Sequence, residues 1–260
     1  MNYQVEGGGN MKKLENRVAL VTGGSRGLGE AIVYALAEEG ANVGVNYVRN
    51  KELAEQICES IRKKNGVKAI TLKADVSIPD EVQEMVDTML KEFGKIDILV
   101  NNAGIVSRGN IVDFSLEDWN RVLAVDLTGI FLCTKAVLPS MLKRREGRII
   151  NIASQLGQIG GAGRVAYCTA KGGVISFTKA LARELAQDGI LVNCVAPGPI
   201  ETDMLASASE EWRRTKESSL PLGRFGWPKE LAPSVVFLAS SDGDIYVGQT
   251  LGPNCGDVML

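Results

Sequence analysis

Histidine is absent from all 260 residues of this chain. Its absence excludes Ser-His-Asp hydrolysis, histidine-ligated zinc and the commonest general base of enzymes. The five cysteines are scattered without a Cys-x-x-Cys pair, which favours buried, reduced thiols over a metal or redox site. We therefore expect no metal site, and any acid–base chemistry must use another side chain.

Strong charge and long apolar runs are also missing. The net charge of −2 gives no basic footprint for nucleic acid or for an anionic membrane. No stretch reaches the roughly 18 continuous apolar residues of a membrane span, and the first residues lack the apolar run of a signal peptide. We expect a cytoplasmic protein that binds neither nucleic acid nor membrane, with residues 1–16 as a flexible leader.

Apolar β-branched runs alternate with longer segments of helical periodicity along the chain. Such hydrophobic strands indicate a parallel sheet covered on both faces. Right-handed crossovers then give a doubly wound (Rossmann-type) α/β fold that binds ligands outside the carboxyl ends of its strands. Residues 17–260 are predicted to form one such domain, with about seven strands. Strands are expected at 17–22, 42–47, 67–73, 97–101, 148–153, 190–196 and 249–251, and helices at 27–39, 51–64, 80–93, 116–145, 165–187 and 229–239.

The stretch 198–227 follows neither pattern. It comes after the sixth predicted strand, so it overhangs the ligand crevice at the carboxyl edge of the sheet. Long loops inside compact domains are usually lids or binding loops, and we expect a mobile lid that closes over substrate. A static pair of surface helices is the alternative.

A glycine-rich loop directly follows the first predicted strand. It reads Thr22-Gly-Gly-Ser-Arg-Gly-Leu-Gly29 and leads into a helical pattern. Unpaired N–H groups and the positive end of the helix dipole converge there, and glycine lets the backbone approach a pyrophosphate closely. The strand–loop–helix context predicts a dinucleotide site, although the glycine spacing alone also fits a plain tight turn.

The phosphate form of the dinucleotide, NADP(H), is favoured. NAD-binding versions place an acid about 20 residues beyond the glycines to hold the ribose hydroxyl. This chain has Tyr47-Val-Arg49 there, with no acid, and Arg26 in the loop adds a second guanidinium. Two such groups suit a 2′-phosphate through bidentate hydrogen bonds. The alternative is that Arg49 is only a solvated residue before a helix.

Tyr167 and Lys171 lie four residues apart on a predicted helix, so both project from one face. Ser154 lies just beyond the fifth predicted strand, where the crevice opens. A nearby ammonium lowers the pKa of a phenol from about 10, and a serine hydroxyl can polarise a carbonyl. A tyrosine and a lysine at this spacing are, by themselves, common on helix surfaces.

Taken together, the motifs resemble those of the short-chain dehydrogenase/reductase family. Thr22-Gly-x-x-x-Gly27-x-Gly29, Asn101-Asn-Ala-Gly104, Ser154, Tyr167-x-x-x-Lys171 and Pro197-Gly198 occur in that family's order and spacing across residues 17–253. The resemblance implies a tyrosine acid/base, a lysine that lowers its pKa and holds the nicotinamide ribose, a serine that orients the carbonyl, and Asp75-Val76 along the adenine. The expected cofactor contacts are Thr22, Gly23, Ser25, Arg26, Gly27, Leu28, Gly29, Tyr47, Arg49, Asp75, Val76, Asn102, Ala103, Gly104, Tyr167, Lys171, Pro197, Gly198, Ile200 and Thr202.

The chain departs from the family pattern at Asp126. Family members usually carry an asparagine here, whose backbone helps hold a water that relays protons to the lysine. An aspartate can keep the backbone role, so we expect activity to survive. The expected catalytic residues are therefore Ser154, Tyr167, Lys171 and Asp126.

Within the family, the chain is most similar to 3-oxoacyl-acyl-carrier-protein reductases, notably in residues 195–204 and 221–226. Those reductases dock an acidic carrier on two basic residues. This chain keeps Arg145 at the first position but has Asp188 at the second, and an acid repels an acidic partner. The resemblance also implies a homotetramer packed through the helices expected at 116–145 and 165–187.

Other functions are left open by the residues. A smaller ketone or an acyl-CoA is an alternative substrate, and so is a secondary alcohol in the oxidative direction. A dinucleotide-sensing protein without catalysis is a remote alternative, since fold does not imply activity.

Overall fold

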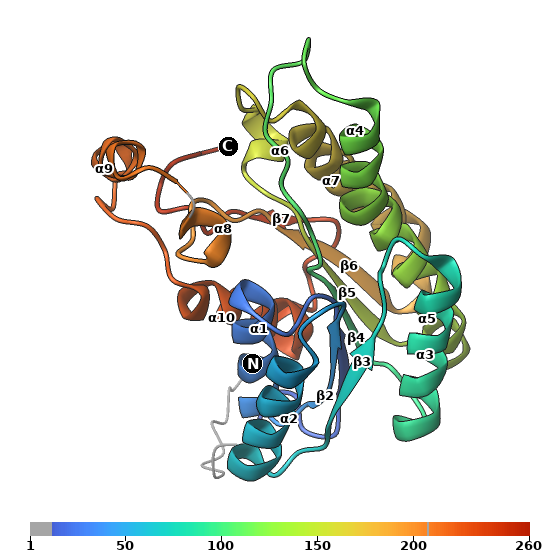
Figure 1. The fold of residues 1–260 in the computed structure, drawn as a ribbon. Coiled ribbons are helices and arrows are strands. Elements are labelled where there is room, and N and C mark those ends of the chain that lie inside the picture. Colours follow the sequence, from blue (N-terminus) through green and yellow to red (C-terminus); the bar gives the residue numbers. More distant parts are fainter. Residues whose placement is uncertain (1–11, 207) are drawn as a thin grey trace, which may run out of the picture.

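Seven parallel strands form one sheet in the order β3-β2-β1-β4-β5-β6-β7 (Figure 1). The computed structural model describes residues 12–206 and 208–260. The order reverses direction between β1 and β4, which creates the crevice where such folds bind ligands. The predicted doubly wound α/β fold is confirmed. The strands are β1 (Val18–Val21), β2 (Asn42–Tyr47), β3 (Ala69–Lys73), β4 (Ile98–Asn101), β5 (Gly147–Ile152), β6 (Ile190–Val195) and β7 (Thr250–Leu251).

Helices cover both faces of this sheet. In Figure 1, α1, α2 and α10 lie on one side and α3, α5 and α7 on the other. Their bounds are α1 (Gly27–Glu38), α2 (Lys51–Asn65), α3 (Pro79–Phe93), α5 (Gly129–Arg144), α7 (Val165–Leu185) and α10 (Pro228–Ala239). Shorter elements are α4 (Leu116–Leu123), the π-helical η1 (Ala124–Thr128), α6 (Leu156–Ile159), η2 (Ala186–Asp188), α8 (Asp203–Ala206), α9 (Glu210–Ser219) and η3 (Ser241–Gly243).

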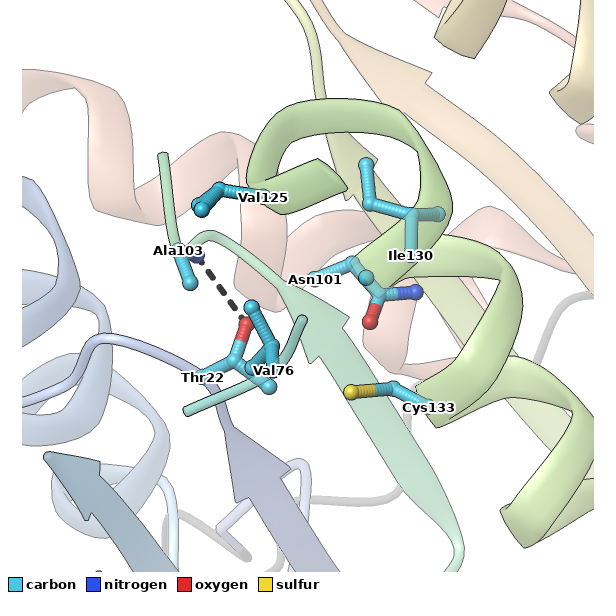
Figure 2. A pocket seen from close by; sticks show the side chains of 8 residues that line it. Thr22, Val76, Asn101, Ala103, Val125, Ile130 and Cys133 are labelled. Atoms are coloured by element: carbon cyan, nitrogen blue, oxygen red, sulfur yellow. Dashed lines mark hydrogen bonds between the residues drawn. The ribbon is translucent and has the colours of Figure 1, made fainter. Parts of the chain in front are cut away.

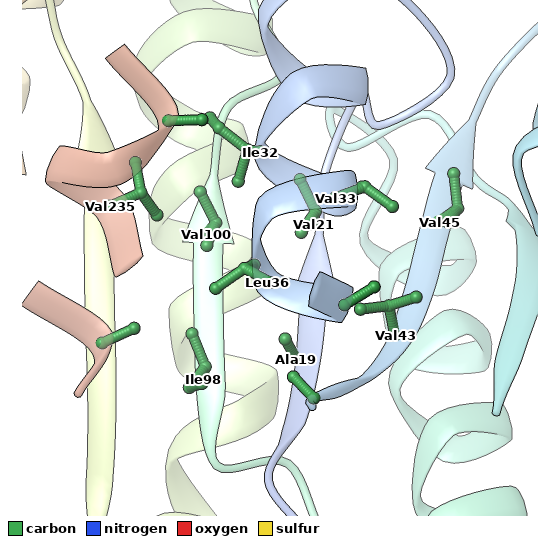
Figure 3. Close-up of a cluster of buried hydrophobic side chains, with 14 of the residues drawn as sticks. Ala19, Val21, Ile32, Val33, Leu36, Val43, Val45, Ile98, Val100 and Val235 are labelled. Carbon is green, nitrogen blue, oxygen red and sulfur yellow. The ribbon is translucent and has the colours of Figure 1, made fainter. Parts of the chain in front are cut away.

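Each face of the sheet has its own hydrophobic core. On the first face, Ile32 and Leu36 of α1 pack over the central strands, with Val235 of α10 beside them (Figure 3). On the second face, Met85 of α3 and Val137 of α5 belong to the other large cluster. Strands buried on both sides need apolar residues at successive positions, and β1 reads Val-Ala-Leu-Val with all four residues buried.

The helix predicted at 116–145 contains a π-helical turn. α4, η1 and α5 follow one another without a break, and η1 occupies residues 124–128. By length and composition, the run Leu116–Arg144 is apolar enough to cross a membrane, since an 18-residue window within it has a mean hydropathy of 1.7. Here it packs against the domain, with Cys133, Val137 and Met141 buried in the core.

The predicted leader reaches residue 16, and its first eleven residues lie outside the described part of the chain. Residues 12–16 pack onto the domain instead of extending from it. Leu14 is buried in the first core cluster, and Lys13 forms an ion pair with Asp242 at 2.6 Å. An apolar side chain that can reach the core is pulled in by hydrophobic burial.

The stretch 198–227 contains two short helices, α8 and α9. α9 begins at a cap formed by Ser209, whose hydroxyl accepts a hydrogen bond from the backbone N–H of Trp212. In Figure 1, α9 lies at the edge of the molecule, on the carboxyl side of the sheet. We call residues 199–225 the lid segment below.

Candidate active site

The loop after β1 is fixed to the loop after β4. The Thr22 hydroxyl accepts hydrogen bonds from the backbone N–H groups of Asn102, at 2.9 Å, and Ala103, at 3.0 Å. The Asn102 side chain donates in return to the backbone carbonyls of Thr22 and Gly23. This reciprocal pairing ties the two strands together at the point where the strand order reverses.

Asn46 on β2 holds the glycine loop from the other side, and our reading of the sequence assigned it no role. Its side-chain carbonyl accepts a hydrogen bond from the backbone N–H of Gly23 at 2.9 Å, and its amide donates to carbonyls of Leu72 and Ala74. Its signal in the sequence is a polar residue inside an otherwise apolar strand, because a buried amide is retained only where it finds partners.

The amino end of α1 is built to receive an anion. Arg26, the residue before the helix, has an extended backbone, and no side chain caps the helix. The first-turn N–H groups are therefore free for a ligand. Gly29 is needed for the close packing below them, because an added Cβ would lie 2.2 Å from the carbonyl oxygen of Gly23. Free donors on a tightly packed glycine turn fit the pyrophosphate of a dinucleotide.

The two arginines predicted for a 2′-phosphate are both exposed at the surface. Arg26 lies 3.6 Å from Asp203 of α8, an open ion pair that solvent screens strongly. Arg49 follows β2 and is also exposed. Tyr47 is buried in the core, so of the residues predicted at the end of β2, Arg49 has the side chain that is open to a ligand.

A gap too narrow for a water molecule lies at the predicted adenine end (Figure 2). Thr22, Val76, Ala103 and Val125 line part of it. Next to it, hydrogen bonds from Ser77 and Arg121 outweigh the effect of burial and hold the pKa of Asp75 below its usual range. The side chain of Asp75 therefore stays an ionised acceptor at this edge.

Ser154, Tyr167 and Lys171 come together at the carboxyl end of β5. Ser154 follows β5 and is buried, while Tyr167 and Lys171 lie one turn apart on α7. The Lys171 ammonium lies 5.7 Å from the centre of the Tyr167 ring and donates to the carbonyl of Ile152 at 3.0 Å. The three predicted side chains thus share one site.

Close packing of α6 on α7 brings the serine loop to the tyrosine. Gly157 in α6 touches the backbone of the catalytic helix, and a Cβ there would lie 2.6 Å from the carbonyl carbon of Lys171. The backbone N–H of Gln155 donates to the carbonyl of Pro197 at 3.0 Å. Only a glycine at position 157 allows α6 to approach α7 this closely.

Asp126 on the π-helical turn faces the lysine. Its carboxylate lies 3.2 Å from the Lys171 nitrogen, and its side chain is 0% exposed. The other carboxylate oxygen accepts a hydrogen bond from the backbone N–H of Ile105 at 2.8 Å. Gly104 lies directly over this pair, since an added Cβ would be 2.9 Å from the carboxylate.

The pKa of Tyr167 lies above its ordinary value, whereas the sequence led us to expect it below. Burial penalises the phenolate most, and the negative charge of Asp126 adds to that effect. Lys171 lowers the pKa as expected, and so does the nearby Ser154 hydroxyl, but together they do not outweigh burial. For Lys171, burial lowers the pKa, and Asp126 and Tyr167 more than restore it, so the ammonium stays charged.

The lid segment starts beside the glycine loop, and its base is held by backbone contacts. A Cβ on Gly27 would lie 3.7 Å from the Thr202 side chain, and the N–H of Gly198 donates to the carbonyl of Pro253. Ile200 pairs with Gly226 in an isolated bridge that closes the base of the segment.

Two partly exposed ion pairs fasten α9. Arg213 pairs with Glu201 within the segment. Lys216 reaches Asp257 near the carboxyl terminus, at 2.6 Å, and Gln155 donates to the same carboxylate. The end of the chain thus connects the lid segment to the residue that follows Ser154.

Comparisons with known proteins agree with this geometry. The family model described as short chain dehydrogenase matches residues 17–213. The chain is 46% identical over 251 residues to a 3-oxoacyl-[acyl-carrier-protein] reductase of Synechocystis sp., covering 96% of this chain and 100% of that protein. It is 43% identical over 244 residues to the reductase FabG of Staphylococcus epidermidis, covering 94% and 100%. It is 44% identical over 247 residues to FabG of Vibrio cholerae, covering 95% and 99%.

Proposed function

The chain belongs to the short chain dehydrogenase family, and on that premise we propose that it is an NADP(H)-dependent reductase of 3-oxoacyl thioesters. The observation that carries the proposal is the grouping of buried Ser154 and Lys171 with half-buried Tyr167 at the carboxyl edge of the sheet. Relatives of nearly equal length, at 43–46% identity, are named as reductases of this substrate class.

Ser154, Tyr167 and Lys171 have separate roles in orienting the carbonyl, transferring the proton and stabilising charge. The nicotinamide, when bound, supplies a hydride to the carbonyl carbon and leaves in its oxidised form. Tyr167 donates the proton that the carbonyl oxygen takes up, so the ketone becomes a secondary alcohol. Ser154 donates a hydrogen bond that orients the carbonyl, and the Lys171 ammonium stabilises the phenolate that remains.

The protonated state of Tyr167 at neutral pH fits the reductive direction. A phenol whose pKa lies above its ordinary value stays protonated at neutral pH and is ready to donate. Oxidation of an alcohol needs the same group as a base, which requires its ionised form. The oxidative alternative is therefore disfavoured at neutral pH and gains as the pH rises.

We assign a preference for NADP(H) because two exposed arginines lie near the ribose end of the predicted cofactor site. Arg26 and Arg49 have no carboxylate closer than 3.6 Å within the described residues, so both can turn to a 2′-phosphate. No acid occupies the end of β2, where an NAD-specific site would need one.

Carrier docking is weakened by an ion pair. Arg145 lies 2.9 Å from Asp188 and also donates to the carbonyl of Gln187. The basic residue at the first predicted docking position is thus neutralised by the acid at the second. We propose that the thioester is recognised mainly through its acyl and pantetheine parts, so a CoA thioester serves nearly as well as one on an acyl carrier protein.

We also propose a cytoplasmic homotetramer. Phe131 and Leu142 of α5 and Leu116 of α4 are large apolar side chains that remain 46%, 40% and 73% exposed. A partner subunit would cover this surface. Light scattering tests the assembly, and a mass near the 27.9 kDa of one chain would contradict it.

The central experiment follows NADPH absorbance with acetoacetyl-CoA as substrate. Turnover by the wild-type protein, and its loss in Tyr167→Phe with cofactor binding retained, would support the proposal. Cofactor binding without turnover of any ketone or alcohol in a broad panel would instead support the dinucleotide-sensing alternative.

A further inference from the structure

Two arginines at the mouth of the site have no part in the chemistry described above. Arg164 immediately precedes α7 and lies three residues before Tyr167, while Arg108 is in the loop after β4. The backbone N–H of Gly109 donates to the carbonyl of Gly163 at 3.0 Å. This hydrogen bond joins the two loops, and the arginines flank it from either side.

Arg164 is the residue just before the first turn of α7, three positions before Tyr167, and its backbone is not helical. The charge of Arg164 is near enough to Tyr167 to favour its phenolate. The guanidinium is therefore within electrostatic range of the group that protonates the substrate carbonyl.

The pair lacks a counter-ion. In residues 12–206 and 208–260, no carboxylate lies within ion-pair distance of Arg108 or Arg164, although most other arginines there are paired. Arg164 is half-buried, and burial together with the charge of Arg108 lowers its pKa. Two like charges kept together without an acid destabilise the unliganded protein, and such arrangements concentrate at ligand sites.

We propose that Arg108 and Arg164 form an anion subsite that takes the carboxylate of an oxo-acid substrate whose ketone is reduced at Tyr167. Guanidinium groups bind carboxylates through paired, charge-assisted hydrogen bonds. The subsite adds free oxo acids, and the matching hydroxy acids in reverse, to the thioesters of the proposed function. The phosphate of a pantetheine arm is many bonds from the reacting ketone, so the carboxylate is the anion that fits a position next to Tyr167.

The test compares a charged and an uncharged version of one substrate. We would measure kcat/KM with NADPH for acetoacetate, ethyl acetoacetate and acetoacetyl-CoA, using wild type, Arg164→Gln, Arg108→Gln and the double variant. Arg183→Gln is the matched control, since Arg183 is an exposed arginine on the same helix. We expect Arg164→Gln to lose about 10- to 100-fold on acetoacetate while ethyl acetoacetate stays within about twofold.

Several results would overturn the subsite. Equal losses on acetoacetate and its ester would show a structural effect, and an equal loss in Arg183→Gln would show a general charge effect. A loss confined to acetoacetyl-CoA would assign the arginines to its phosphates.

The subsite rests on the proposed function only through turnover, so a binding measurement separates the two. If no variant reduces any of the three substrates, the proposed function fails. Calorimetric titration of acetoacetate into the protein with NADP⁺ then decides the subsite. Binding that disappears in the double variant supports it, and absence of binding to wild type overturns it.

Discussion

The glycine-loop side and the lid side of the site are held together by different forces. On the glycine-loop side, Thr22, Asn46 and Asn102 are buried or half-buried and exchange hydrogen bonds among three strands. On the lid side, α9 is fastened by ion pairs that solvent reaches, Arg213 with Glu201 and Lys216 with Asp257. The first set is costly to break, because buried polar groups would be left without partners.

The contrast matches what each side must do. A dinucleotide needs a preformed cradle, and any movement of the loop would lose its alignment with the pyrophosphate. A substrate must enter and leave, and we expect the lid segment to open, because partly exposed ion pairs cost less to break than buried hydrogen bonds. A rigid cradle and a mobile cover would thus use different kinds of contact within one crevice.

Tyr167→Phe should have the largest effect, because the tyrosine lies where the two sides meet. The ring keeps its packing on α7, but the proton donor is lost, and we expect kcat to fall about 10²- to 10⁴-fold. Steady-state NADPH oxidation measures this, with fluorescence titration of NADPH as a check that the cofactor still binds. Retention of more than a few per cent of the wild-type rate would remove Tyr167 from its assigned role.

Gly29→Ala should break the rigid side. The new methyl would overlap the carbonyl oxygen of Gly23, at 2.2 Å, and backbone cannot move aside without losing the hydrogen bonds of Asn102. We expect NADPH affinity to fall at least about 100-fold and thermal stability to drop. Gly66→Ala is the control for NADPH affinity: its added Cβ meets nothing within 4 Å, and its φ of +70° strains the backbone far from the cofactor loop, so it should lower stability but not affinity. Equal NADPH affinity in wild type and Gly29→Ala would show that the loop adapts.

Cofactor discrimination should be smaller. From Arg26 and Arg49, we expect kcat/KM with NADPH to exceed that with NADH by about 5- to 150-fold, as charge-assisted hydrogen bonds of about 1–3 kcal/mol would give. Arg49→Ala and Arg26→Ala should each reduce the ratio, and Arg62→Ala, on α2, should leave it unchanged. Equal or better efficiency with NADH would refute the assignment of these arginines.

Asp126→Asn should change the pH profile more than the maximal rate. The charge of Asp126 opposes ionisation of Tyr167, so its removal should lower the pKa of the phenol. In alcohol oxidation, Tyr167 acts as the base, so the rate rises with pH as the phenol ionises. In Asp126→Asn this rise in rate should occur at lower pH than in the wild type. The pH dependence of kcat/KM for a 3-hydroxyacyl-CoA measures this, with Asp188→Asn as the control. An unmoved midpoint would mean that Asp126 has no electrostatic effect on the tyrosine.

Loosening the lid should have the smallest effect on rate. Asp257→Asn weakens the contact with Lys216, and we expect amide hydrogen exchange in residues 199–225 to accelerate and KM to rise only a few-fold. Asp244→Asn, which breaks an ion pair with Arg148 away from the lid, is the matched control. In the wild type, exchange in this segment that is equally slow with and without NADP⁺ and a substrate analogue would exclude a mobile lid.

The sheet and the catalytic pair could be predicted because their signals are local. The strands were predicted within two residues at each end, since each is mostly apolar and rich in β-branched residues, and Tyr167 and Lys171 share a helix face by their spacing. α9 was predicted only as the alternative to an irregular lid, because Trp212 is its one apolar residue and no apolar stripe marks it, although Ser209 begins it with an ordinary cap.

What the sequence did not reveal depends on contacts between distant residues. The direction of the Tyr167 pKa shift depends on burial and on Asp126, which lies 41 positions away and reaches the site only through the π-helical turn. Arg108 and Arg164 come together through a hydrogen bond between loops that no local pattern announces. Asn46 looked like an ordinary strand residue until its four partners were visible.

The π-helical turn at residues 124–128 also records how a new side-chain position can arise in an old helix. A π turn accommodates about one extra residue per turn, and each residue advances an α-helix by about 100°. Such an insertion lets α4 and α5 keep independent orientations: α4 toward the catalytic helix, and α5 toward the sheet. Removing one residue here would return the segment to a plain α-helix, and either Asp126 would swing away from Lys171 or the whole of α5 would turn its core face aside. A change in chain length at residues 124–128 would therefore alter both the active site and the packing of the fold.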